Sequence, residues 1–486
     1  GATCLIPGTG RLPYPNWASL QGASQRPGHW GLLRYTVLGM NYRALGMTHT
    51  TIYAESRHCS PRRKTSPGRA APDYLSRASI RKISLGPAGR ALLAAVALVA
   101  GLALSTACPG PGETPLAWDF PDVCLEGQAP DEACYVEKRA PGSAEVALAA
   151  GLAARYMAEH PAELMAWDWG EGTLMFAMTE LSRVTGDGTY LHYARTWMDH
   201  HLAAGYPLTW SDHCPPALTA LALYEDTGDV AYRAVVEDVM YYLESEALRT
   251  EEGGISHMGT QDLFGPTLWL DSLFMFGMAL TRWAEQTGDE GPLEVLGEQI
   301  GIFARALQTE GGLFYHAYQW PTAPDPDVFW ARGNGWVTVA GYDYLRARRL
   351  RGERDRAVSE LLGRQVAAVR ETQDSTGLWW TVMDRPGEIY LETSAAALFG
   401  FGMARGYRYG LLGPEVLPSV GMALGGVRAR ILRDSQERPY VTGISGPTTA
   451  GSFTNYASVP LVDDRHFGVG AVMLFLIEAS GLPLGQ

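Results

Sequence analysis

Residues 181–202 read LSRVTGDGTYLHYARTWMDHHL, and residues 223–243 read LYEDTGDVAYRAVVEDVMYYL. Both stretches place Thr-Gly-Asp between two segments with apolar residues at helical spacing, and residues 280–303 repeat the arrangement. Glycine readily adopts the left-handed conformation that ends a helix, and aspartate is a favoured N-cap of the next one. These stretches therefore predict helical hairpins that recur every forty to sixty residues.

A second repeat lies at the other end of each hairpin. The segments that start at Gly253, Gly311 and Thr376 each contain a glycine-rich turn and a short aromatic piece. A loop with proline follows, and then a polar residue precedes a very apolar helix rich in small residues. The polar residues in these three places are Asp271, Arg332 and Glu392.

Six segments are apolar around the whole helical circumference, which is typical of buried helices. The helices after each Thr-Gly-Asp corner instead carry charge on one side and should form an outer layer. Residues 143–486 are therefore predicted to fold as an all-α (α/α)6 toroid. The loops that lead into the six inner helices, here called the loop mouths, should all lie on one face. A deep cleft on that face is the default site. The six inner segments are residues 169–183, 212–224, 271–283, 334–346, 392–406 and 466–480.

Composition narrows the class of partner. The 486 residues include 14 Trp and 23 Tyr, more than a minimal core needs, so these side chains are expected to line either a carbohydrate cleft or a wet interface. Thirteen of the 39 Lys and Arg residues precede Cys108, against two acidic residues, which leaves the rest of the chain strongly acidic. This balance argues against nucleic acid as a partner.

The beginning of the chain does not read as a fold. Residues 1–80 show no sustained period and are interpreted as a disordered or artefactual extension. Residues 81–108 combine a basic stretch, a short apolar stretch and small residues before Cys108, which is typical of a secretory signal and resembles a lipoprotein signal. An exported protein is expected, either periplasmic, secreted or lipid-anchored at Cys108.

The cysteines and histidines give no metal signal. Residues 109–142 are interpreted as a linker, in which Cys124 and Cys134 could close a small disulfide loop, and Cys214 would remain single. No CxxC motif and no histidine pair at ligand spacing occurs, so neither a zinc site nor a cofactor is expected. The oligomeric state stays open.

Asp212 and Asp271 are the candidate catalytic residues. Each begins a predicted inner helix and follows a tryptophan by two positions. Two carboxyl groups in one cleft are what acid/base attack on a glycosidic linkage requires, one protonated and the other ionised. The alternative is that each aspartate only caps its helix.

Histidine, arginine and glutamate residues near the starts of the inner helices can have structural or functional roles. His257 and His316 lie in the aromatic pieces, where a structural role is as reasonable as a functional one. Arg332, between two tryptophans, must find an anion or the face of an aromatic ring, or else pair with a structural acid such as Glu392. Glu171 and Glu392 are expected to stabilise the first turns of helices through the helix dipole.

The chain resembles the unsaturated uronyl hydrolases, and among them the unsaturated rhamnogalacturonyl hydrolases of glycoside hydrolase family 105. The resemblance covers roughly residues 145–480 and rests on WLDSLFM, GGLFYHAY, FWARGNGWV, ETSAAALFGFGMARG and FGVGAVMLFLIE, in that order. FWARGNGW, residues 329–336, is the most specific of these motifs. Ser272 stands where the family pattern has glycine, and the flanks of Asp212 match less well.

The resemblance implies a six-hairpin toroid that acts on an oligosaccharide carrying a 4,5-unsaturated uronate at its non-reducing end. Asp271 looks like the acid that protonates C4 of the double bond, and Asp212 looks like the partner that positions water for C5. The hemiketal formed in this way opens and releases the leaving sugar. The residues implied to line the sugar site are His316, Trp330, Arg332 and Trp336, with Arg332 and His316 near the carboxylate, together with Trp169, His257 and Asn334.

Three alternatives remain on the sequence alone. The sister family acts on unsaturated glucuronyl units of glycosaminoglycan-type fragments with the same fold. A surface glycan-binding lipoprotein could use a degenerate toroid, although Asp212 and Asp271 are both retained. A toroid with terpene or prenyl chemistry is disfavoured because no extended aspartate-rich metal motif occurs.

Overall fold

The computed structural model describes residues 138–263, 265–321 and 328–484. The predicted extension, the signal segment with Cys108 and the Cys124–Cys134 loop lie outside these residues. Cys214 is described, and it is buried with a free thiol. Among the described helices, none combines the length and the apolar character that crossing a bilayer requires.

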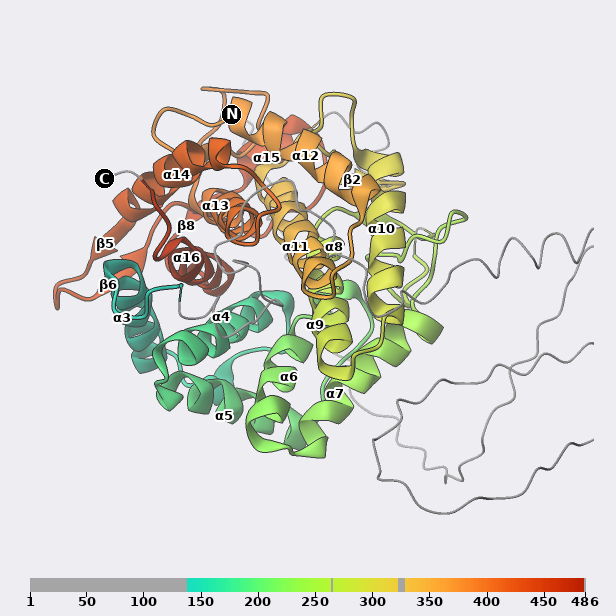
Figure 1. Ribbon diagram of the computed structural model, residues 1–486, viewed down its shortest axis with the longest axis horizontal. Helices are drawn as coiled ribbons and strands as arrows, with labels where there is room; N and C mark the ends of the chain where they lie inside the picture. The colour runs from blue at the N-terminus through green and yellow to red at the C-terminus, as the bar shows by residue number, and fades with distance from the viewer. Residues whose placement is uncertain (1–137, 264, 322–327, 485–486) are drawn as a thin grey trace, which may run out of the picture. The chain divides into compact units, whose positions relative to one another are not determined.

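Six inner helical segments form a closed ring (Figure 1). Each packs against the inner segments before and after it, and the last one contacts the first. They correspond to the six predicted apolar segments, and every residue of the last segment from Phe467 to Ala479 is buried. The inner segments are α4 (Trp169–Thr185), α6 (Pro216–Thr227), α8 with α9 (Ser272–Met275 and Gly277–Thr287), α11 (Ala331–Leu350), α13 (Thr393–Arg408) and α16 (His466–Ala479).

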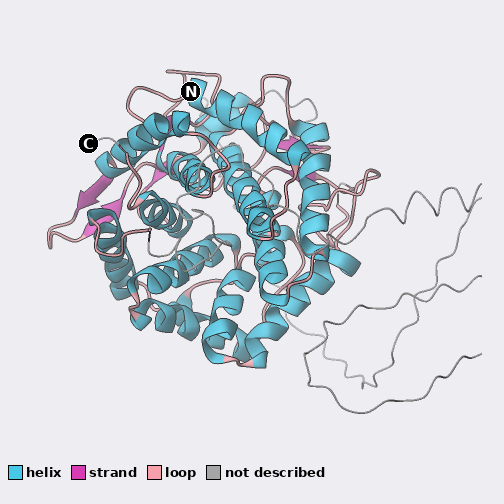
Figure 2. Cartoon of the chain, viewed as in Figure 1, coloured by secondary structure: helices cyan, strands magenta, loops and turns pink. Residues whose placement is uncertain are grey.

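Six outer helices surround this ring, and Figure 2 shows how far helix dominates the architecture. Inner and outer helices alternate along the chain, so the inner ones all run in one direction and their N-termini gather on one face. The predicted (α/α)6 toroid is confirmed. The outer helices are α3 (Ala144–Glu159), α5 (Gly188–Ala204), α7 (Val230–Tyr241), α10 (Gly291–Leu307), α12 (Arg356–Glu371) and α14 (Leu417–Ala429).

The Thr-Gly-Asp corners have the predicted geometry at all three glycines and at two of the three aspartates, whereas Glu290 and not Asp289 is the N-cap residue of α10. Gly186, Gly228 and Gly288 end their helices with φ of 72°, 69° and 73°. Asp187 and Asp229 then cap α5 and α7 by accepting a hydrogen bond from the backbone two residues later. At these corners, local sequence therefore determines where the inner helix ends and the outer helix begins.

Short extended pieces lie between outer and inner helices, and they bring aromatic side chains to the helix mouths. They form four two-stranded antiparallel pairs and leave the fold all-α in character. The pairs are β1 (Leu268–Trp269) with β2 (Ala317–Tyr318), β3 (Trp379–Trp380) with β4 (Leu391–Glu392), β5 (Ile431–Arg433) with β6 (Pro439–Val441), and β7 (Ile444–Ser445) with β8 (Leu461–Val462). The remaining short helical elements are η2 (Ala162–Leu164), η3 (Ser211–His213), η4 (Tyr242–Glu246), η5 (Pro414–Val416) and α15 (Phe453–Ser458).

Charged side chains lie buried toward the C-terminal ends of the inner helices. Arg405 of α13 donates to Asp343 of α11 and, at 2.8 Å, to Glu478 of α16. Arg346 and Arg282 also bind Asp343, at 3.0 and 3.2 Å. Although burial alone would raise it, these arginines hold the pKa of Asp343 well below its usual range. This ionic network closes the toroid at the end opposite the loop mouths.

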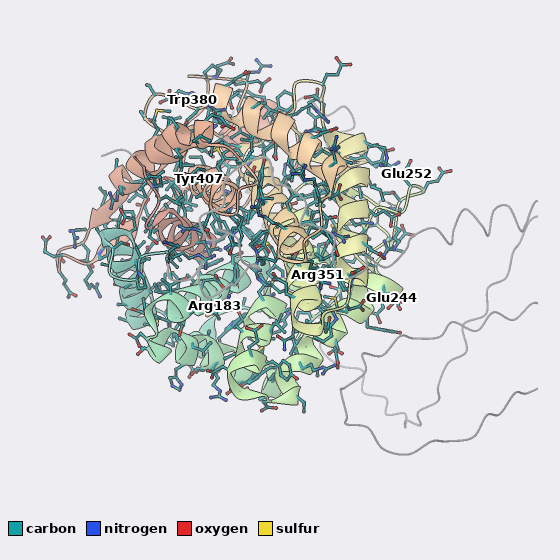
Figure 3. All side chains as sticks on the ribbon, viewed as in Figure 1. Arg183, Glu244, Glu252, Arg351, Trp380 and Tyr407 are labelled. Atoms are coloured by element: carbon teal, nitrogen blue, oxygen red, sulfur yellow. The ribbon has the colours of Figure 1, made fainter. Side chains whose placement is uncertain are left out.

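Small residues let the inner helices approach closely, and the side chains drawn in Figure 3 fill the interior of the ring. A Cβ atom on Gly402 of α13 would lie 2.9 Å from the backbone carbonyl carbon of Thr338 in α11. Gly470 of α16 is equally close to the backbone of Leu174 in α4. The ring therefore depends on glycine at these helix contacts.

We expect Gly402→Ala to destabilise the protein by ~1–3 kcal/mol, because the clash is with backbone that cannot move aside. The matched control is Gly363→Ala in outer helix α12, where a Cβ atom would meet nothing within 4 Å. That variant should be neutral or more stable by up to ~1 kcal/mol. Urea unfolding midpoints of both variants check this, and equal midpoints would contradict the packing argument.

Candidate active site

The candidate site is formed by residues at the N-terminal ends of the inner helices. Asp168 caps α4, Asp212 lies in η3 just before α6, and Asp271 directly precedes α8. Trp330 precedes α11 and Glu392 caps α13. Because the inner helices are parallel, these residues belong to the same face of the ring.

Asp212 and Asp271 are nearly enclosed, with 8 % and 9 % of their surface exposed. Each has one buried carboxylate oxygen, Oδ1, with no hydrogen-bond partner among the described residues. Asp271 makes no capping hydrogen bond, and the position before α6 is held by Pro215. The alternative that both aspartates serve as N-caps is therefore wrong.

Burial raises the pKa of both carboxyl groups. The pKa of Asp271 rises to about 7, with Arg332 partly offsetting the effect of burial. The pKa of Asp212 rises well above its usual value because of burial, and the nearby charges of Asp271 and Asp168 raise it further. Two interacting carboxyl groups of this kind titrate as a pair and retain a proton near neutral pH.

His257 lies beside Asp212. Its Nε2 is 4.0 Å from Oδ1 of Asp212, and its Nδ1 is 2.9 Å from the hydroxyl of Ser272. The ring stacks on Trp269 with centroids 4.4 Å apart and planes 1° from parallel. Burial lowers the pKa of His257 to about 3, so the ring is neutral.

His316 lies on the other side of Trp269. Its ring packs edge-on against that indole at 5.2 Å and stacks on Trp330 at 4.1 Å. Nδ1 is 2.7 Å from the hydroxyl of Tyr456, while Nε2 is buried with no partner among the described residues. Burial lowers the pKa of His316 well below its usual value, with additional contributions from His257 and Arg332.

Arg332 is fully buried, and both of its terminal nitrogens have protein partners. Nη1 donates to the Ser445 carbonyl at 2.7 Å and pairs with Glu392 at 3.4 Å. Nη2 donates to the Gly446 carbonyl at 2.8 Å and to Thr448 at 3.1 Å. The structure thus matches the alternative in which Arg332 pairs with Glu392, and only Nε lacks a partner among the described residues.

Three other candidates from the sequence are Asn334, Trp336 and Trp169, which pack against the helices and segments around them. Asn334 is fully buried, and its amide binds the backbone of Phe314 and Trp330, so it locks α11 to the preceding aromatic segment. Trp336 packs against Phe274 at 4.3 Å inside the core. Trp169 is only half-buried but packs edge-on against Trp336. In this structure Asn334 and Trp336 are thus engaged by the backbone and by the apolar core, and their predicted sugar contacts stay predictions.

The structure adds residues to the site that the sequence did not single out. Trp269 lies between the two histidines, and Trp210 approaches His257 at 6.0 Å. Both tryptophans precede a candidate aspartate by two positions, and this spacing could have identified them. Tyr456 reaches His316 from 140 residues away, and no local pattern in the sequence indicates that contact.

Neighbouring side chains largely enclose the two aspartates. Cavities of about 490 and 690 Å³ lie beside outer helix α12. Within the described residues, no group of three or more His, Cys, Asp or Glu side chains could hold a metal ion. The chemistry available here is that of the carboxyl pair and the neutral rings around it.

Comparison with known proteins agrees with this architecture. The profile of Glycosyl Hydrolase Family 88 matches residues 151–482. The chain is 27 % identical over 318 residues to the unsaturated rhamnogalacturonyl hydrolase YesR of Bacillus subtilis, covering 64 % of this chain and 89 % of that protein. Protein Atu3128 of Agrobacterium fabrum is 30 % identical over 232 residues, which are 42 % of this chain and 98 % of that protein.

Solved structures share the fold. A family 105 glycoside hydrolase from C. acetobutylicum superimposes with a TM-score of 0.63 at 24 % identity, covering 69 % of this chain and 99 % of that one. The unsaturated glucuronyl hydrolase of Bacillus sp. GL1 superimposes with a TM-score of 0.56 at 18 % identity, covering 68 % and 95 %. With the family profile spanning most of the ring and the carboxyl pair at its mouth, the chain belongs to Glycosyl Hydrolase Family 88 and is a glycoside hydrolase.

Proposed function

We propose that the protein removes a 4,5-unsaturated uronate from the non-reducing end of oligosaccharides produced by a polysaccharide lyase. The observation that carries this proposal is the buried pair Asp212 and Asp271, each with an unpartnered carboxylate oxygen in an aromatic surround. The similarity to an unsaturated rhamnogalacturonyl hydrolase supports rhamnogalacturonan fragments as the substrate.

The reaction follows from a carboxyl pair that retains one proton. Asp271 donates its proton to C4, and the ring oxygen stabilises the positive charge that develops at C5. Water adds at C5 and loses a proton to Asp212. The hemiketal opens to a C5 ketone, and the hemiacetal left at C1 then releases the leaving sugar, so one water is consumed for each uronate removed.

The substrate carboxylate meets a positive environment at this face. The N-termini of the parallel inner helices carry partial positive charge, and each favours a nearby anion. The buried N–H donors that lack a partner among the described residues include Nε1 of Trp269, Nε1 of Trp330 and Nε of Arg332. A bound carboxylate would satisfy such donors, which otherwise cost free energy by being buried unpaired.

A second substrate class is supported by the fold comparison. The structure of the Bacillus sp. GL1 enzyme is described as an unsaturated glucuronyl hydrolase responsible for the degradation of glycosaminoglycan. Glucuronyl and galacturonyl units no longer differ at C4 once C4 and C5 are planar, so the two classes differ in the leaving sugar and in the linkage at C1. Specificity would then reside in contacts beyond the acid pair.

The decisive experiment follows the ultraviolet absorbance of unsaturated disaccharides made from rhamnogalacturonan, homogalacturonan and a glycosaminoglycan. Hydration removes the conjugated double bond, so the absorbance should fall, and fastest with the rhamnogalacturonan product. A fall only with the glycosaminoglycan product would reassign the substrate. No fall with any of them, from a folded protein that binds uronates, would favour a glycan-binding role.

Asp271→Asn should lower turnover by about 100- to 10,000-fold, because the amide has no proton to donate to C4. Binding of the unsaturated sugar should change far less. The control is Asp226→Asn, an exposed carboxylate near the C-terminal end of α6 that should leave turnover unchanged. Near-normal turnover of Asp271→Asn would remove the proton-donor role from this residue.

The pH dependence of kcat/KM should show an alkaline limb near pH 7. The donor is active only while protonated, and the pKa of Asp271 lies at about 7. The rate should therefore be retained below this value and lost as the pH rises through it, with the apparent pKa belonging to the coupled pair. A rate that stays constant from pH 6 to about pH 9 would be inconsistent with a carboxyl donor.

A further inference from the structure

Ser272 links the segments that carry the two aspartates. It follows Asp271 as the first residue of α8, and it is fully buried. Its hydroxyl contacts Nδ1 of His257, and Nε2 of the same ring faces the unpartnered Oδ1 of Asp212 at 4.0 Å. Ser272, His257 and Asp212 thus form a line from the start of α8 to the segment before α6.

The backbone and the stacking hold the His257 ring in place. Its amide donates to the Thr267 carbonyl at 2.8 Å, and its carbonyl accepts from Ser211 at 3.0 Å, next to Asp212. The ring lies flat on Trp269. A half-turn of the imidazole about its Cβ–Cγ bond would keep this stacking but would put carbon where each nitrogen stands. The contact that distinguishes the two orientations is the hydroxyl of Ser272.

The direction of that hydrogen bond sets the tautomer of His257. The Ser272 hydroxyl is buried and needs an acceptor, and Nδ1 is the acceptor available to it among the described residues. A neutral ring that accepts at Nδ1 carries its single hydrogen on Nε2. The ring therefore presents an N–H group to Asp212.

We infer that Ser272 is a positioning residue that holds His257 as the Nε2–H tautomer, so that His257 donates to ionised Asp212 and the proton shared by the aspartates resides on Asp271. The inference rests on the proposed function, in which Asp271 is the donor. Closing the gap between Nε2 and Oδ1 to a hydrogen bond needs a shift of about 1 Å, and catalytic hydrogen bonds commonly tighten in this way when substrate binds.

The other charged groups around Asp212 and Asp271 explain why a hydrogen bond from His257 to Asp212 is needed. Burial favours the protonated form of both aspartates; the charges of Asp271 and Asp168 add to this effect at Asp212, whereas Arg332 opposes it at Asp271. The surrounding charges thus bias the shared proton toward Asp212, the wrong residue for protonating C4. A hydrogen bond from Nε2–H of His257 stabilises ionised Asp212 and so shifts the shared proton to Asp271. The remaining titratable groups facing the pair are Cys214, Tyr242 and His316, and the last is neutral.

The tautomer can be measured without any substrate. In the full-length protein labelled with 15N-histidine, two-dimensional NMR distinguishes protonated from unprotonated ring nitrogens, and His257→Gln identifies the signals of His257. We expect a neutral ring with hydrogen on Nε2, and a mixture of tautomers in Ser272→Ala. Hydrogen on Nδ1 in the unmodified protein would overturn the inference, whatever the enzyme's substrate.

Kinetics then test the consequence. Ser272→Ala should lower kcat about 10-fold with little change in KM, because fewer molecules hold the proton on Asp271, and Ser272→Thr should recover most of the rate. The matched control is Ser182→Ala, which removes a buried hydroxyl at the end of α4 away from the mouths and should leave kcat unchanged. Unchanged kcat in Ser272→Ala would refute the positioning role, whereas inactivity of the unmodified protein on every unsaturated sugar would refute the proposed function alone.

Discussion

The rest of the structure depends on the buried ionic network at the C-terminal ends of the inner helices. Six parallel inner segments bring their negative helix ends together there, and neighbouring dipoles of the same direction repel. Arg405 bridges Asp343 and Glu478, and Arg408 adds a 3.0 Å contact to Glu478, so positive charge is placed among those ends. Removing one member of such a network leaves an uncompensated buried charge, which typically costs about 3–5 kcal/mol.

The same parallel arrangement decides the chemistry of the open end. Helix N-termini favour ionised carboxylates by about 0.3–1 kcal/mol each, whereas full burial can raise the pKa of a carboxyl group by several units. Burial outweighs the dipoles at Asp212 and Asp271, whose pKa values both rise. Glu392 has a structural role instead, because it caps α13 and is bonded to Arg332 and to the Ser445 amide. Position at a helix mouth therefore does not decide the role of an acid; its partners do.

The sequence predicted what local rules control. Each of the three Thr-Gly-Asp corners depends on one glycine and one aspartate in succession, so those hairpins could be read directly, and the six inner segments could be counted from their apolar character. The acid pair could be located because each aspartate lies at the start of an apolar segment. Contacts between distant segments could not be read this way, and Tyr456 with His316 is one example. Arg332 is another, since its partners at Ser445 and Gly446 lie more than one hundred residues away.

FWARGNGW shows why a specific motif can still mislead about individual side chains. Arg332 ties the mouth of α11 to the segment after β7, and that segment continues to α15, which carries Tyr456 to His316. Asn334 fastens the same mouth to Phe314, two residues before His316. Two residues of the motif thus support His316 from two sides. These contacts hold the buried imidazole of His316 in one position. They leave its Nε2 atom without a hydrogen-bond partner among the described residues, so that this atom is available to the site.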